Sequence, residues 1–330
     1  MKASKKFVSA IAAVSALALG LAGCAGDSGD SADGAFKIGV TQIITHPALD
    51  AIVDGFQQAL EDAGVEATYD LQNAQGESSN AATIAGAFKE DGSIDLVLAV
   101  ATPTAVAVAA QITDRPIVFA GITDPVDAGL VPSLEPGGAN ISGASDKVPA
   151  PVELIKEILP NVSTIGVLYS SGEANSVVQV NDLKAAAAEH GIEVVESAIT
   201  NSSEVATGVQ ALGGVDAIFV PTDNTVVASL ENVIAFAQSN QIPLFPADVD
   251  SVARGGVATQ GIDYWQHGYK AGELAVKVLK DGVDIGTLAT IVEDPSETTI
   301  YVNKEAAAAQ GVTLSDSLLE RAEEATPSEG

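Results

Sequence analysis

The stretch that decides the fold reads TIGVLYSSGEANSVVQVNDLKAAAAEHGI, from Thr164 to Ile192. It joins an apolar strand (Ile165 to Tyr169) to an amphipathic helix through a polar loop (Ser170 to Ser176), and Gly191 ends the helix. This order, with the polar residues placed where the strand ends and the helix begins, is typical of one βα unit in a parallel sheet.

The first half of the chain contains the same order. A strand begins at Ile38, a loop contains His46, and residues 48–63 form a helical pattern. Further along, DLVLAVATPT from Asp95 matches DAIFVPTDNT from Asp216. Strands that alternate with helices predict right-handed crossovers and parallel sheets, so we expect two α/β halves.

A length of 330 residues also favours two domains over one. We expect residues 141–147 to be a crossing point between the halves. A helix is expected over 225–238, and another over 268–280 that ends at Gly282.

Composition excludes several classes of function. A net charge of −29 disfavours binding to nucleic acid. A single cysteine, Cys24, permits no disulfide within the chain and no cysteine-based zinc site. The sequence contains no GxSxG, HExxH, P-loop or GxGxxG motif, so we expect no catalytic residues and no cofactor. A metal pair of His46 and Asp50 is disfavoured because Pro47 makes this segment a simple helix start.

The N-terminus has the pattern of an export signal. Lysines precede an apolar run from Phe7 to Leu21, which is too short for a spanning helix. The tetrapeptide that ends at Cys24 resembles the lipobox of bacterial lipoproteins. That resemblance implies a signal peptide over 1–23 and lipidation, including a palmitate-type acyl chain, at Cys24; an ordinary secretory signal is the alternative. Residues 24–35 are small and polar, which predicts a flexible tether.

Polar loops follow the predicted strands in both halves, at the sheet edge where doubly wound folds bind ligands. Their hydroxyls and helix N-termini suit a carboxylate, and Asp124, Asp223 and Asp248 suit an ammonium. The sequence therefore indicates a site for a zwitterion such as an amino acid. The alternative interpretation of each loop is a helix N-cap without a ligand.

From Lys37 to Val312, the chain resembles the substrate-binding lipoproteins of ABC importers, specifically the tryptophan/tyrosine-type family. The landmarks of this resemblance are HPALD at 46–50, NAQG at 73–76, ATP at 101–103, TDP at 123–125, IGVLY at 165–169, EANS at 173–176, VPTDNT at 220–225 and GIDY at 261–264.

The resemblance implies the type I periplasmic-binding-protein fold, in which two doubly wound parallel-sheet lobes enclose a ligand cleft. Lobe 1 would comprise 36–145 plus 263–292, and lobe 2 would comprise 146–262 plus 293–330. Three hinge crossings would lie near Ser145, Ile262 and Asp294.

The resemblance also implies which residues bind the ligand. Those of lobe 1 would be Thr45, Gln75, Thr102 and Thr123. Those of lobe 2 would be Ser170, Ser171, Asn175, Thr222, Asp223, Asn224 and Asp248.

The implied function is solute capture on the outer face of the cell membrane. A lipid-anchored monomer would close on a small zwitterion, in this family an amino acid and possibly an aromatic one, and deliver it to an ABC permease energised by a separate ATPase. Two alternatives stay open. One is a sugar or nucleoside binder of the same fold, in which Trp265 with Tyr169 or Tyr264 would form a stacking platform. The other is an extracytoplasmic receptor or enzyme.

Overall fold

The computed structural model describes residues 35–293 and 298–326. The predicted signal peptide, Cys24, all of the predicted tether except Ala35, and the crossing predicted near Asp294 lie outside the described residues. Within the described part, no helix has both the length and the apolar character needed to cross a membrane.

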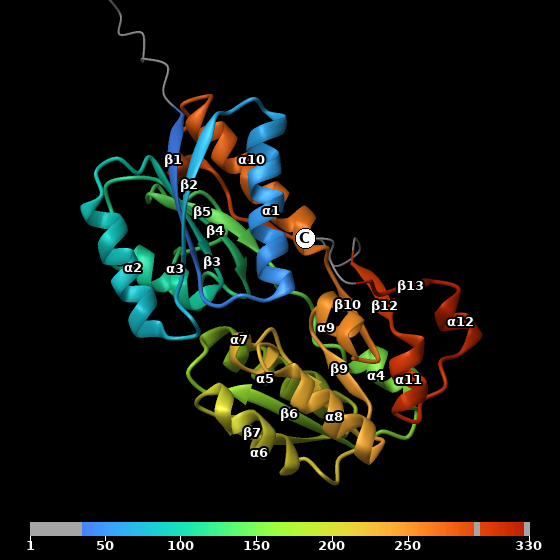
Figure 1. Cartoon of the computed structure of the whole chain (residues 1–330). Helices are drawn as coiled ribbons and strands as arrows, with labels where there is room; N and C mark the ends of the chain where they lie inside the picture. Colours follow the sequence, from blue (N-terminus) through green and yellow to red (C-terminus); the bar gives the residue numbers. More distant parts are fainter. Residues whose placement is uncertain (1–34, 294–297, 327–330) are drawn as a thin grey trace, which may run out of the picture. The chain divides into compact units, whose positions relative to one another are not determined.

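The first lobe is built on a six-stranded sheet in which every neighbouring pair of strands is parallel (Figure 1). Its strands, in spatial order, are β11 (Ile291–Val292), β5 (Ile141–Ser145), β4 (Ile117–Ile122), β3 (Leu96–Val100), β1 (Phe36–Gln42) and β2 (Ala67–Asn73). The helices of this lobe are α1 (Pro47–Asp62), α2 (Ser78–Glu90), α3 (Thr102–Ala109) and α10 (Tyr264–Leu279), and a short 3₁₀ turn, η2, covers Ile285–Thr287.

Both faces of this sheet are covered, which the continuous apolar run of β3 predicts. All five residues of β3 are buried. Leu96 and Leu98 belong to one hydrophobic cluster, whereas Val97 and Ala99 belong to another. Alternate side chains of a strand point to opposite faces, so the two clusters are the cores on the two sides of the sheet.

Helices α1 and α10 approach each other closely because glycines line their contact. A Cβ atom on Gly55 would lie 2.0 Å from the carbonyl oxygen of Trp265, and one on Gly268 would lie 2.1 Å from that of Ile52. Any larger residue at these positions would force the helices apart. This packing fixes the start of α10, and with it Tyr264, beside the first turn of α1.

The second lobe contains two sheets. The larger is parallel, with the order β7 (Glu193–Ile199), β6 (Thr164–Ser170), β8 (Ala217–Val220) and β9 (Leu244–Pro246). The smaller has the order β10 (Ala258–Gly261), β12 (Thr299–Val302) and β13 (Ala322–Glu324), with β10 and β12 antiparallel. The helices of this lobe are α4 (Val152–Ile158), α5 (Ala174–Glu189), α6 (Val205–Gln210), α7 (Asn224–Val227), α8 (Leu230–Asn240), α9 (Val249–Arg254), α11 (Lys304–Ala309) and α12 (Asp316–Leu319), and the 3₁₀ turn η1 covers Ser202–Glu204.

The predicted α/β architecture with two parallel sheets is confirmed, and two local features differ from the expectation. The segment 141–147, expected only as a crossing, begins with a buried strand, β5, between β4 and β11. Gly143 permits this, because a Cβ there would lie 2.0 Å from the carbonyl oxygen of Phe119. The expected helix over 225–238 is divided into α7 and α8, since Ser229 (φ −126, ψ 25) leaves the helical conformation.

Candidate functional site

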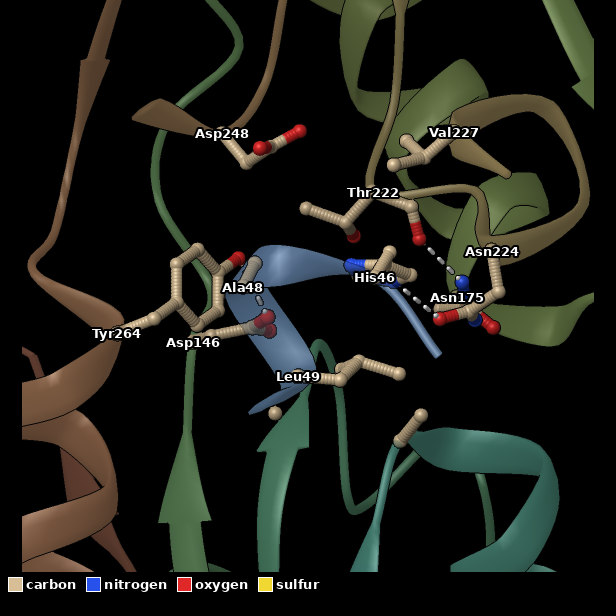
Figure 2. Close-up of a pocket in the computed structure, with 12 residues that line it drawn as sticks. His46, Ala48, Leu49, Asp146, Asn175, Thr222, Asn224, Val227, Asp248 and Tyr264 are labelled. Atoms are coloured by element: carbon tan, nitrogen blue, oxygen red, sulfur yellow. Dashed lines mark hydrogen bonds between the residues drawn. The ribbon is translucent and has the colours of Figure 1, made fainter. Parts of the chain in front are cut away.

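A small cavity lies where the two lobes meet, lined by residues of both. Its position agrees with the rule that doubly wound sheets bind ligands beyond the carboxyl ends of their strands. Figure 2 shows the side chains around it. The lining residues are His46, Ala48, Leu49, Ala101, Gly121, Asp146, Asn175, Thr222, Asn224, Val227, Asp248 and Tyr264.

Polar contacts join the lobes around this cavity. The His46 ring of the first lobe places Nε2 3.3 Å from Oδ1 of Asn224 in the second lobe. Thr123 Oγ1 lies 3.3 Å from Thr222 Oγ1, and the side-chain amide of Gln179 donates to both hydroxyls. These contacts hold the two lobes together over the cavity.

An ion pair outside the cavity also crosses between the lobes. Lys147 Nζ lies 3.0 Å from Asp124 Oδ2, on the first lobe, and 3.3 Å from Asp182 Oδ2, on α5 of the second lobe. Burial opposes ionisation of Asp124, but hydrogen bonds from backbone N–H groups and from Lys147 hold its pKa below the ordinary value. Asp124 is therefore committed to Lys147 and is not available to a ligand.

The second-lobe side of the cavity is ordered by two buried carboxylates, Glu173 and Asp223. Asp223 accepts hydrogen bonds from the backbone N–H of Ser170 (2.5 Å), from the hydroxyl of Ser176 (2.6 Å) and from the backbone N–H of Val226 (2.8 Å). Burial and the neighbouring Glu173 raise the pKa of the Asp223 carboxyl, while these three donors oppose the shift. Asp223 thus caps α7 and ties it to β6 and α5.

Two other buried carboxylates line the cavity and are less completely satisfied. Asp146 accepts from the Tyr264 hydroxyl at Oδ2 (3.0 Å), and Asp248 accepts from the backbone N–H of Ser251 at Oδ1 (2.8 Å). Asp146 Oδ1 and Asp248 Oδ2 are buried and have no hydrogen-bond partner among the described residues. Asn175 Oδ1 and His46 Nδ1 are likewise buried and have no hydrogen-bond partner in the described part of the chain. Buried polar atoms of proteins are almost always paired, so these four atoms mark places for a ligand.

The electrostatics agree with this assignment. Burial raises the pKa of Asp248 to about 6 and raises the pKa of Asp146 above its ordinary value. Burial lowers the pKa of the His46 imidazole, which keeps the ring neutral at pH 7. Shifted carboxyls in a cleft are characteristic of functional sites, because a buried negative charge without a partner favours a cation.

The structure brings four of the predicted site residues to the cavity wall: Asn175, Thr222, Asn224 and Asp248. Thr102 and Thr123 are buried next to the cavity; Thr102 follows the lining residue Ala101, and Thr123 touches Thr222. Asp223 and Ser170 lie behind the wall, where Asp223 is fully occupied by its three donors.

Three predicted residues lie elsewhere in the structure. The side chain of Thr45 is exposed and accepts a hydrogen bond from Asn73, and Gln75 is exposed in a tight turn with φ 56. Ser171 is exposed and contacts the carbonyl of Ile199. None of the three lines the cavity between the lobes.

Sequence reasoning did not place His46, Asp146 or Tyr264 among the residues that bind an amino acid, and expected Tyr264 only in the stacking platform of the sugar or nucleoside alternative. The loop that contains His46 reaches the second lobe through Asn224, the first residue of α7. Asp146 directly follows β5, and Tyr264 begins α10. Both lie at predicted hinge crossings, so their positions held the signal that they sit between the lobes. Within the residues that the structure describes, no cluster of three metal-ligating side chains is present.

Comparison with known proteins identifies the family. The model for "ABC transporter substrate binding protein" matches residues 37–326. The chain belongs to this family. Over 276 residues it is 41% identical to the tyrosine-binding protein of Clostridioides difficile. The aligned region covers 82% of this chain and 79% of that relative.

Solved structures extend the comparison to conformation. An ABC domain from Streptococcus pneumoniae in complex with L-Trp is 37% identical, with a TM-score of 0.84 over 88% of this chain and 99% of that one. A ligand-free, open substrate-binding protein from Clostridium difficile is 40% identical over the same shares, with a TM-score of 0.66. At similar sequence identity, the fold of this substrate-binding protein therefore matches the L-Trp complex more closely than the ligand-free, open structure. These structural relatives also confirm the predicted type I fold.

Proposed function

We propose that this substrate-binding protein captures a free aromatic L-amino acid, tyrosine or tryptophan, between its lobes. The observation that carries the proposal is the pair of buried carboxylate oxygens, Asp146 Oδ1 and Asp248 Oδ2, that line the cavity without a partner among the described residues. An ammonium group supplies three N–H donors and a positive charge, which is what two buried carboxylates require.

The remaining lining residues fit the rest of such a ligand. Ala48, Leu49, Ala101, Gly121 and Val227 leave room for an apolar ring among small side chains. The hydroxyl of Thr102 has no hydrogen-bond partner within the described part of the chain and stands at the start of α3, where a carboxylate would meet a hydroxyl donor and the helix N-terminus. The relatives that bind tyrosine and tryptophan support the same class of ligand.

A sugar is a poorer fit. Tyr264 is the one aromatic side chain among the lining residues, and its hydroxyl is engaged by Asp146. Trp265 stacks on Tyr269 instead, with ring centroids 5.4 Å apart, and the Tyr169 hydroxyl donates to Glu196. Among the described residues, Trp265 thus stacks on Tyr269 rather than on Tyr169 or Tyr264, which disfavours the stacking platform that a sugar site would use.

The proposed cellular role is that of a lipid-anchored importer component. Cleavage before Cys24 and lipidation of that residue would hold the chain at the outer face of the membrane, and the two predicted lobes (36–145 plus 263–292, and 146–262 plus 293–330) would present their closed form to an ABC permease. The chain itself would act as a monomer. Replacing Cys24 with Ala should release the protein from the membrane fraction, and retention there would contradict lipid anchoring.

A thermal-shift screen tests the ligand class. L-tyrosine and L-tryptophan are expected to raise the melting temperature, because a ligand at a hundred times its dissociation constant stabilises the folded state by about 2.7 kcal/mol. Glucose and adenosine should have no effect. A shift with a sugar or nucleoside, and none with any amino acid, would contradict the proposal.

A further inference from the structure

The side chain of Glu173 never touches the cavity, yet it organises the residues that do. It is 6% exposed at the entrance to α5. Oε1 accepts from the backbone N–H (2.9 Å) and the hydroxyl (2.7 Å) of Thr225. Oε2 accepts from the backbone N–H (3.0 Å) and the side-chain amide (2.6 Å) of Asn224, and from the side-chain amide of Asn175 (3.2 Å). Every one of these five contacts uses Glu173 as the acceptor.

This arrangement determines which way the Asn224 amide points. A carboxylate cannot donate, so the atom of Asn224 that faces Glu173 must be Nδ2. The other end of the amide, Oδ1, is then the atom presented to His46 across the gap between the lobes, at 3.3 Å from Nε2.

The Asn224 oxygen in turn fixes the state of the His46 ring. A carbonyl oxygen accepts but does not donate, so Nε2 of His46 must carry the proton. The neutral ring holds a single N–H, which leaves Nδ1 as a bare acceptor. That atom is buried on a residue that lines the cavity, and it has no partner among the described residues.

We propose that Glu173 is a positioning residue for ligand binding: through Asn224 it holds His46 as the Nε2–H tautomer, so that Nδ1 accepts a hydrogen bond from the ligand ammonium. The inference rests on the proposed function, since it takes the ligand to be an amino acid. Because His46 belongs to the first lobe and Glu173 and Asn224 to the second, the acceptor is set only when the lobes close. Ligand recognition and closure are thereby coupled through one hydrogen-bond chain.

His267 has the tautomer opposite to that proposed for His46, so it serves as an internal reference in the same protein. Its Nε2 accepts from the backbone N–H of Gly121 (3.0 Å), so its proton resides on Nδ1, which faces Glu293 Oε1 at 3.0 Å. Nitrogen-15 spectra of the histidine rings distinguish the two tautomers directly. With L-tyrosine bound, His46 should be protonated at Nε2 and His267 at Nδ1. The His46→Phe variant assigns the His46 signals by their loss.

The decisive variant is Glu173→Gln, with the exposed Glu193→Gln of the same lobe as its matched control. An amide at position 173 can donate to Asn224, so the Asn224 amide turns and presents N–H to His46, which shifts the His46 proton to Nδ1. We expect L-tyrosine affinity to fall about tenfold or more, because a donor then faces the ammonium. Binding of 3-(4-hydroxyphenyl)propionate, which lacks the ammonium, should change less than about twofold in the same variant.

Two results would overturn the inference. One is a wild-type complex in which His46 carries its proton at Nδ1. The other is a Glu173→Gln variant that loses affinity equally for both ligands, which would indicate a structural role alone. If Glu173→Gln does not fold, His46→Phe tests the same acceptor, and it should weaken L-tyrosine but not the des-amino ligand. A wild-type chain that binds no amino acid overturns the proposed function and this inference with it, whereas an Nδ1 proton on His46 in a chain that does bind L-tyrosine overturns this inference alone.

Discussion

Asp223 and Asp248 are two buried aspartates with the same local role and different functions. Each precedes a short helix in the second lobe and accepts from a backbone N–H three residues later, Val226 for Asp223 and Ser251 for Asp248. In Asp223 the second oxygen is occupied by Ser170 and Ser176, whereas in Asp248 the second oxygen has no partner among the described residues. A buried carboxylate is therefore structural when both oxygens are satisfied, and open to a ligand when one is not.

Replacing Asp223 should have the largest effect, and that effect should be on stability. The change Asp223→Ala leaves the backbone N–H groups of Ser170 and Val226 buried without an acceptor, at a cost of about 3 kcal/mol in the free energy of unfolding. Urea unfolding followed by circular dichroism measures this loss. An Asp223→Ala variant with wild-type stability and lost ligand binding would reverse the roles assigned to the two aspartates.

Replacing Asp248 should weaken binding without lowering the stability of the free protein. The change Asp248→Asn keeps an oxygen for the Ser251 N–H but removes the charge that faces the ligand. We expect L-tyrosine affinity to fall by about 1.5–3 kcal/mol, roughly ten- to more than a hundredfold, by calorimetry. Unchanged affinity would place the ammonium elsewhere.

The pH dependence of binding also tests whether Asp248, unlike Asp223, pairs with the ligand ammonium. The raised pKa of Asp248, about 6, means that the free protein holds a proton there below pH 6. An ammonium pairs only with the ionised form, so binding releases this proton. Affinity should fall as the pH is lowered through 6, by about tenfold for each further pH unit, and should be constant above about pH 7.

The raised pKa of Asp248 also makes the stability of the free protein depend on pH. Because the folded-state pKa is raised above the unfolded value, ionised Asp248 lowers the stability of the free protein above pH 6. The pKa of Asp146 is raised in the same direction, so Asp248→Asn should weaken the pH dependence of affinity without abolishing it. Calorimetry in two buffers of different ionisation enthalpy counts the protons released. Affinity that rises as the pH falls would contradict the assignment.

The smallest expected effect concerns the ion pair outside the cavity. Lys147 and Asp182 are 39% and 44% exposed, so their attraction is screened by solvent and contributes at most about 1 kcal/mol. The change Lys147→Met should favour the open form and weaken L-tyrosine about two- to fivefold, with the difference vanishing at high salt. A loss as large as that of Asp248→Asn would mean that closure depends on this pair rather than on the ligand.

The sequence predicted the fold better than the site, for a physical reason. Strand and helix periodicity is local, so the parallel sheets followed from patterns such as the buried run of β3. Polar loops also pointed to the correct edge of each sheet, which placed Asn175, Asn224 and Asp248 at the cavity. Whether a loop residue serves a cap or a ligand depends on partners distant in the chain. Asp223 is structural, and not open to a ligand as Asp248 is, because Ser170 and Ser176 donate hydrogen bonds to it. These donors are distant from Asp223 in the chain, so no local pattern reveals them.

The missed residues have the same explanation. Asp146 and Tyr264 are far apart in the sequence and meet through a hydrogen bond of 3.0 Å at the junction of the lobes. His46 depends on Asn224 in the other lobe. Residues of this kind acquire their role only when the lobes close, so a single sequence shows their positions without their partners.

The structure of the complex with L-tyrosine tests the central claim most directly. We predict that the ligand ammonium lies about 3 Å from Asp248 Oδ2 and Asp146 Oδ1, with its ring toward Leu49 and Val227. A ligand whose carboxylate faces these two aspartates, or whose ammonium displaces Ser170 and Ser176 from Asp223, would contradict the account.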